Sequence, residues 1–147
     1  MARKVFVSFD YVRDLSRVGR IRDLPDTILN APAGFKDDSV WNIALRDGDD
    51  AVLRLIDTAL HVTTVTLVCI GSRTAADRHV DYAIEQSIRR GNGVVGVRIH
   101  GIPDAEGNVD SEGTVPGLLI ENWYKVYTYV DQAQLAQWIE EAAREAV

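Results

Sequence analysis

The hydrophobic positions between residues 64 and 99 follow two different periods, and this predicts a strand, a helix and a second strand in succession. Residues 64–70 form a continuous apolar and β-branched run, the pattern of a strand covered on both faces. Apolar residues then recur four apart over residues 80–88, which is helical spacing. Residues 94–99 form a second buried strand. Two parallel strands joined by a helix make one βαβ unit.

The ends of the predicted helix carry their own signals. Thr74 with Asp77 three residues later has the form of a capping box, so the helix is expected to start near Ala75. Gly91 and Gly93, on either side of Asn92, are expected to stop it.

The rest of the chain predicts further elements on both sides of this unit. Before it, the expected order is a strand, a helix, a loop with a short strand near Phe35 and Lys36, and two helices. After it come a long polar loop, an aromatic strand and a last helix capped by Asp131 with Gln134. The expected ranges are a strand at 4–9, a helix at 12–24 with arginines outside, helices from Val40–Trp41 and over 52–60, a loop at 101–117 and a strand at 123–130.

This order predicts a single domain over residues 1–147, with a doubly wound, mostly parallel, flavodoxin-like sheet and helices on both faces. Ligands of such sheets bind at the carboxyl ends of the strands, so a site is expected around residues 71–83. A receiver domain is excluded because the 64–70 strand ends without a phosphorylatable aspartate. A dinucleotide-binding Rossmann domain is excluded because no GxGxxG follows the first strand.

Composition adds limits on partners and location. The net charge of −6 argues against a general nucleic-acid binder, and no Lys/Arg block suggests an anionic membrane surface. No apolar run approaches the roughly 20 residues of a membrane helix, and the N-terminus has no signal-peptide pattern. Cys69 is the single cysteine and is expected to be a buried hydrophobe. These features predict a cytoplasmic protein.

Several segments resemble a bacterial TIR-like family, the flavodoxin-like branch that includes the TIR component of Thoeris anti-phage defence systems. The resemblance is carried by KVFVSFDY at 4–11, FKDDS at 35–39, the whole stretch 64–100, DSEG at 110–113, and the segments 127–131 and 137–143. It implies NAD+ as the substrate, without a metal or a further cofactor, and cleavage of the nicotinamide–ribose bond. It also implies a cyclic or conjugated ADP-ribose messenger for a partner effector, and a TIR–TIR homo-oligomer.

The chemistry of that cleavage makes one residue type decisive. Breaking the N-glycosidic bond builds positive charge on the ribose, which a nearby carboxylate can stabilise. The family's carboxylate is the Glu of a W-x-x-x-E motif on the helix after the third strand, and its positions fall on His79 and Ala83. The catalytic Glu is therefore absent. Glu85 is a poor substitute because two residues on a helix are about 200° apart.

Two interpretations of Ala83 remain open. It is either the natural residue of a catalytically silent relative or an engineered Glu→Ala change that keeps NAD+ or product uncleaved. The otherwise retained motif favours the second interpretation.

Nine further residues are candidates for contacts with the nucleotide, each with a plain structural alternative. Without a ligand role, the residues after the first strand would form an ordinary turn, and those near position 38 would cap a helix. The side chains of the others would be solvated at the surface or packed in the core. The candidates are Ser8, Phe9, Asp10, Asp38, Ser39, Ser72, Arg73, Arg78 and His79. Tyr82 is expected at the surface, and the tryptophans Trp41, Trp123 and Trp138 in the core. His61 and His100 lack partners at metal-ligand spacing.

Three hypotheses about function follow. The first is an NAD+ glycohydrolase or ADP-ribosyl cyclase, impaired here by Ala83. The second is a non-catalytic TIR-like interaction module. The third is a nucleoside deoxyribosyltransferase-like enzyme, which shares the fold and also attacks an N-glycosidic bond. All three place the ligand at the same edge of the sheet.

Overall fold

A computed structural model describes residues 3–21, 27–30 and 39–146 of the chain. The elements in chain order are β1 Arg3–Ser8, α1 Tyr11–Gly19, β2 Thr27–Asn30, α2 Ser39–Asp47, α3 Asp49–His61, β3 Val65–Ile70, a 3₁₀ turn at Thr74–Ala76, α4 Arg78–Arg90, β4 Gly93–Arg98, α5 Gly117–Glu121, β5 Val126–Thr128 and α6 Gln132–Glu145.

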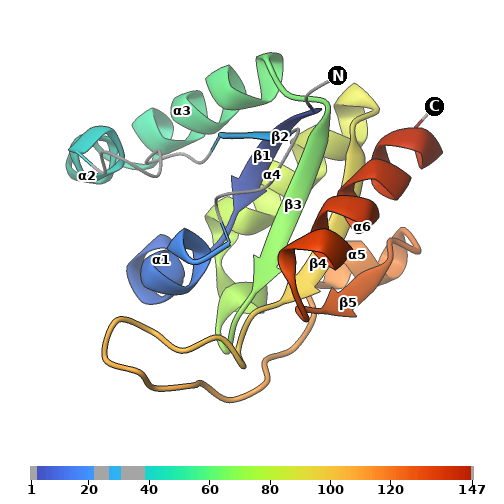
Figure 1. The fold of residues 1–147 in the computed structure, drawn as a ribbon. Helices are drawn as coiled ribbons and strands as arrows, with labels where there is room; N and C mark the ends of the chain where they lie inside the picture. Colours follow the sequence, from blue (N-terminus) through green and yellow to red (C-terminus); the bar gives the residue numbers. More distant parts are fainter. Residues whose placement is uncertain (1–2, 22–26, 31–38, 147) are drawn as a thin grey trace.

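The five strands form one sheet in the order β2-β1-β3-β4-β5, and every pair of neighbours is parallel. In the longest ladder, Val65 lies opposite Gly93 and Ile70 opposite Arg98. This order confirms the predicted flavodoxin-like sheet, which is wholly parallel in the described residues. All five carboxyl ends therefore face the same side, shown at the bottom of Figure 1.

Helices cover both faces of the sheet, as the sequence predicts. On one face α1 and α6 pack on a core that includes Val7, Leu67 and Val97. On the other face α3 packs on Phe6, while α4 and α5 pack on Val68 and neighbouring residues. Cys69 is fully buried, as expected from its place in a central strand.

The start of α4 differs from the prediction. The helix begins at Arg78, and the Asp77 carboxylate is its N-cap, accepting hydrogen bonds from the backbone N–H of His79 at 2.8 Å and of Val80 at 3.3 Å. The Thr74 hydroxyl instead accepts a 2.8 Å bond from the Gly71 N–H. Thr74 is thus used to close the turn after β3, which leaves the capping of α4 to the next acidic residue.

The first helix also differs from its predicted outline. α1 ends at Gly19, and residues 22–24 of the expected helix lie outside the described residues. Val12, the first residue of the helix expected at 12–24, was expected on its apolar, inward-facing side but is 86% exposed. The arginines were expected outside, yet Arg17 is buried together with Asp14. The helix therefore turns a charged pair toward the sheet edge.

The C-terminal third contains one element that the sequence pattern did not predict. α5 precedes the last strand, and β5 covers only three residues of the expected strand at 123–130. Trp123 is 91% exposed, so its expected core position is wrong. Trp138 is buried, as expected. Its ring stacks on that of Tyr127, with ring centroids 4.2 Å apart. The Trp41 side chain and the expected strand near Phe35 and Lys36 lie outside the described residues.

Among the described residues, no helix combines the length and hydropathy needed to cross a bilayer.

Candidate active site

The candidate site lies where the carboxyl ends of β1 and β3 meet. The chain leaves β1 through α1 on one face of the sheet and leaves β3 through α4 on the other, so the two connections diverge at the place where ligands of such sheets bind. The loop of residues 101–116 runs below this edge before it reaches α5 (Figure 1). Three segments that are distant in sequence thus meet at one place.

A hydrogen-bonded network joins these three segments. The Arg13 Nε donates to the Ser72 hydroxyl at 2.7 Å and to the Asp110 carboxylate at 2.9 Å, while its Nη2 donates to the second Asp110 oxygen at 3.1 Å. The Ser72 hydroxyl also donates to Asp110 at 2.7 Å. The bidentate Arg13 contact, followed by the Ser72 bond, holds the pKa of Asp110 well below its usual range.

A buried ion pair lies behind this network. Asp14 is 0% exposed and accepts a 3.2 Å bond from Arg17, whose guanidinium also donates to the carbonyls of Ile102 and Asn108 in the long loop. Burial raises the pKa of Asp14 to about 6 despite the Arg17 bond. The Asp14 Oδ2 has no hydrogen-bond partner among the described residues. Arg17 therefore anchors the loop, while Asp14 carries the cost of burial.

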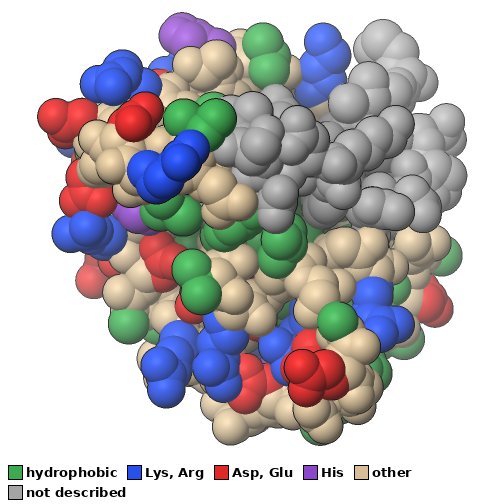
Figure 2. Space-filling model, turned by 90° about the vertical axis from the view of Figure 1, so that its left-hand side faces the viewer, with side chains coloured by type: hydrophobic (Ala, Val, Ile, Leu, Met, Phe, Trp, Pro, Cys, Tyr) green, Lys and Arg blue, Asp and Glu red, His purple; other side chains and the backbone are tan. Residues whose placement is uncertain are grey.

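Two glycines let the backbone approach this charged cluster. A Cβ on Gly71 would collide with the Asp14 carboxylate, and a Cβ on Gly113 would collide with the Gly71 carbonyl and the Ser72 backbone. The end of β3 and the long loop are therefore packed backbone against backbone. Figure 2 shows basic and acidic side chains side by side along the lower part of the molecule, where α1 and this loop lie.

The candidates that follow β1 lie at this edge but are largely covered. Ser8 and Phe9 are buried, and Phe9 belongs to the core on the α1 and α6 face. Asp10 is half-buried and caps α1 by accepting a 3.2 Å bond from the Arg13 N–H. Phe9 thus has a packing role, and Asp10 has a capping role that keeps its carboxylate at the carboxyl end of β1.

The candidates that follow β3 divide into two groups. Ser72 belongs to the Arg13–Asp110 network, and Arg73 beside it is exposed with no hydrogen-bond or ion-pair partner for its side chain among the described residues. Arg78 and His79 turn toward the start of α3 instead. Arg78 donates to Asp49 at 2.7 Å, and the His79 Nε2 lies 3.2 Å from the same carboxylate. Asp38 lies outside the described residues; Ser39 is the first residue of α2, and its side chain is not described.

Position 83 lies on the inner side of α4. Ala83 is 0% exposed and belongs to a cluster with Phe6 of β1 and apolar residues of α2 and α3, against which Tyr11 also packs. Glu85 is exposed and pairs with Arg89 at 3.3 Å, as its helical angle predicts. Tyr82 was expected at the surface, but it is half-buried and its hydroxyl bonds to Asp57 of α3 at 2.9 Å.

Apart from Ser72, the residues that organise the edge were not among the sequence candidates. Arg13, Asp14 and Arg17 lie at spacings of three and four on α1, which is compatible with an ordinary solvated helix face. Asp110 comes from a loop that has no periodicity. A signal did exist, because a long polar loop in a compact domain favours a functional role. Among the described residues, no group of three or more His, Cys, Asp or Glu is arranged to hold a metal ion.

Comparisons with known proteins identify the family of the chain. The family model described as the TIR-like domain of Thoeris protein ThsB matches residues 6–104, from β1 to just beyond β4. The chain belongs to the ThsB TIR-like family. The match includes position 83 and the connections after β1 and β3, whereas Asp110, α5, β5 and α6 lie beyond it.

A relative within this family has a descriptive name. The protein named "Putative cyclic ADP-D-ribose synthase ThsB1" of Bacillus cereus (strain MSX-D12) is 42% identical over 118 residues. The aligned part is 79% of this chain and 62% of that relative, so the chain spans less than two thirds of the relative's length.

Proposed function

We propose that this chain is a ThsB-type TIR-like protein that binds NAD+ at the carboxyl ends of β1 and β3 but cleaves it poorly, because Ala83 stands where the family's catalytic Glu is expected. The intact form of the activity would cleave the nicotinamide–ribose bond and release a cyclic or conjugated ADP-ribose messenger for an effector. The name of the Bacillus cereus relative supports this choice of chemistry.

The location of Ala83 is the observation that carries the proposal. Ala83 belongs to an apolar cluster that includes Phe6 of β1 and against which Tyr11, the first residue of α1, packs, so position 83 lies on the side of α4 that faces β1. We infer that a carboxylate at this position would reach a ribose bound at the carboxyl end of β1, where it could stabilise the developing charge. With alanine the charge that drives the chemistry is missing.

The phosphates of the nucleotide need a cation at this edge. Arg73 is exposed and unpaired among the described residues, and the Arg13 side chain is 39% exposed although it is held by Asp110. We assign Arg73 the main phosphate contact and Ser72 a supporting hydrogen bond. Asp10, just after the carboxyl end of β1, is assigned the role of accepting a hydrogen bond from a ribose hydroxyl.

A titration of the chain with NAD+ tests this proposal. We expect amide signals of residues 8–10 and 71–73 to shift in two-dimensional NMR spectra, while mass spectrometry recovers the NAD+ intact. Arg73→Ala should weaken binding several-fold, about 1 kcal/mol, whereas Arg54→Ala, an exposed arginine on α3, should not.

The absence of a carboxylate at position 83 also favours the non-catalytic interaction module. That alternative predicts no shift with NAD+ at millimolar concentration. Base exchange on deoxynucleosides would instead support the deoxyribosyltransferase-like reaction.

A further inference from the structure

A cavity lies at the opposite end of the sheet from the candidate active site. Its volume is about 300 Å³, and it opens between the end of α4, the turn between α5 and β5, and the end of α6. Gly93 in its wall is the first residue of β4, so the cavity lies at the amino ends of the strands. We propose that this cavity binds a planar heteroaromatic ring that carries an amino group or a positive charge and no phosphate.

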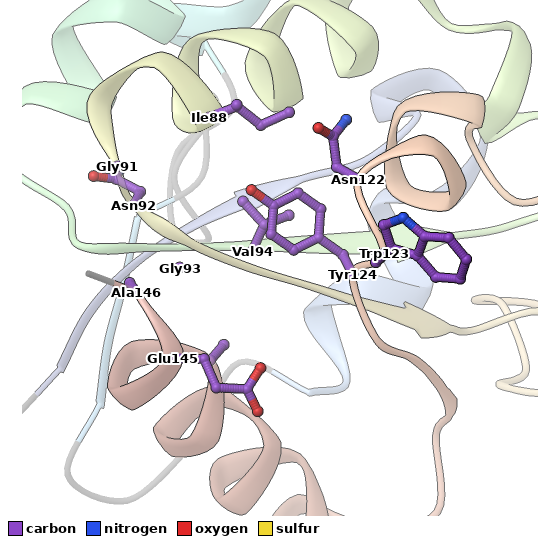
Figure 3. Close-up of a pocket in the computed structure, with 11 residues that line it drawn as sticks. Ile88, Gly91, Asn92, Gly93, Val94, Asn122, Trp123, Tyr124, Glu145 and Ala146 are labelled. Atoms are coloured by element: carbon purple, nitrogen blue, oxygen red, sulfur yellow. The ribbon is translucent and has the colours of Figure 1, made fainter.

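The walls of the cavity suit a flat ring. The Tyr124 ring lies at its centre in Figure 3, with Ile88 on one side and the Gly91–Gly93 segment on another. Gly91 ends α4 in the left-handed conformation at φ 74°, and neither glycine projects a side chain into the space. A ring can therefore contact Tyr124 on one face and backbone on the other.

The polar groups around the cavity are mostly hydrogen-bond acceptors. The Asn122 Nδ2 donates to the Leu118 carbonyl at 2.8 Å, and this leaves its Oδ1 available. One Glu145 carboxylate oxygen accepts a 2.7 Å hydrogen bond from the Lys125 Nζ, and the second oxygen can accept another. The half-buried Tyr124 hydroxyl has no hydrogen-bond partner among the described residues and points toward the Ile88 side of the cavity (Figure 3).

The charge of the lining determines the ligand class. The lining residues include the Glu145 carboxylate but no lysine or arginine. A phosphate would meet a carboxylate whose ion-pair partner, Lys125, is already engaged by it, whereas an amino group or a cationic ring would find acceptors. The charge of this lining is therefore opposite to that of the edge at the carboxyl ends of the strands, where Arg13, Arg17 and Arg73 lie.

Trp123 at the rim gives independent support for a binding role. The end of α5 is a complete Schellman motif, in which the Tyr124 N–H bonds to the Leu119 carbonyl at 3.0 Å and the Trp123 N–H to the Ile120 carbonyl at 3.2 Å. Trp123 occupies the left-handed position of that motif, at φ 62°, where glycine is favoured. Its side chain is 91% exposed, so burial does not offset the backbone strain. A strained, exposed aromatic residue beside a cavity indicates a contact with something outside the fold.

Adenosine and cytidine are suitable probes, because each carries an amino-substituted ring and no phosphate. We expect either nucleoside to shift the amide signals of residues 91–93 and 122–124 in two-dimensional NMR spectra. AMP, which adds only a phosphate, should bind about two- to threefold more weakly, because the repulsion by the exposed Glu145 is screened by water and by Lys125. Tyr124→Phe, which removes only the hydroxyl, should weaken adenosine binding about 2- to 10-fold.

Trp123→Gly separates a binding role from a structural one. Glycine completes the same motif without strain, so the melting temperature should not fall, while nucleoside binding should weaken. The proposal is overturned if neither nucleoside shifts residues 91–93 at millimolar concentration, or if the shifts are confined to residues 8–10 and 71–73. It is also overturned if Tyr124→Phe leaves the affinity unchanged, or if Trp123→Gly lowers the melting temperature and leaves binding intact. None of these results depends on NAD+ cleavage.

Discussion

At the scale of single residues, Asp14 shows how the edge combines a favourable and a costly interaction. Arg17 satisfies one of its oxygens, but the other has no partner in the part of the chain that the structure describes, and the side chain is fully buried. Desolvation therefore outweighs the ion pair, and the pKa of Asp14 rises to about 6 from 3.8. The folded state holds a proton on this group at pH values where the unfolded chain has released it.

This difference predicts that stability falls as pH rises between about 4 and 6. Below the unfolded pKa both states are protonated, and above the folded pKa the folded state carries a buried charge, so the full loss is about 2 to 3 kcal/mol. Urea unfolding at a series of pH values should show this slope, and Asp14→Asn, which does not titrate, should lack it. Parallel pH profiles for the two proteins would show that Asp14 does not titrate in this range.

At the scale of elements, the turn between β3 and α4 depends on close backbone packing. Gly71 lies against Asp14, and Gly113 of the long loop lies against Gly71 and Ser72. The first contact is with the end of a side chain and the second is with backbone, so the second has less freedom to relax.

We therefore expect Gly71→Ala and Gly113→Ala each to lower the free energy of unfolding by about 2 kcal/mol, with the larger effect at Gly113. Gly101→Ala is the matched control, because a Cβ there meets no atom within 4 Å and its change should stay within about 0.5 kcal/mol. Urea unfolding at fixed pH measures all three. Equal effects at positions 101 and 113 would show that the long loop does not pack closely on the end of β3.

How well the sequence predicts an element depends on whether the element has a period. The buried strands and α4 repeat their apolar residues over many positions, so their type and order were predictable. α5 is only five residues long, too short for a periodic pattern, and it was missed. The left-handed conformation of Trp123 was also unpredictable, because the sequence there contains no glycine to mark a helix end.

At the scale of the whole molecule, the parallel sheet places the two proposed binding sites, which differ in charge, at its two ends. The order of strands and helices was enough to predict the sheet and the end at which a ligand should bind. The network at that end was not predictable, because it joins Arg13, Ser72 and Asp110 across as many as 97 positions of the sequence. Such contacts follow from how loops close over the sheet, which no local pattern encodes.

The account as a whole depends on position 83, where the resemblance to the W-x-x-x-E motif puts the missing carboxylate and which lies within the matched residues 6–104. The most direct test is nicotinamide release from NAD+ by the chain as it stands, by Ala83→Glu and by Ala83→Gln, at high protein concentration to favour the TIR–TIR homo-oligomer that the resemblance implies. Ala83→Gln has nearly the same size without the charge, and thermal unfolding of both variants shows whether the buried position tolerates them.

We predict release from Ala83→Glu, with a cyclic or conjugated ADP-ribose product seen by mass spectrometry. The Gln variant and the unchanged chain should be slower by at least a hundredfold, as expected when a charge-stabilising group is lost. A folded Ala83→Glu protein that releases no nicotinamide, or an unchanged chain that releases it equally fast, would contradict the account.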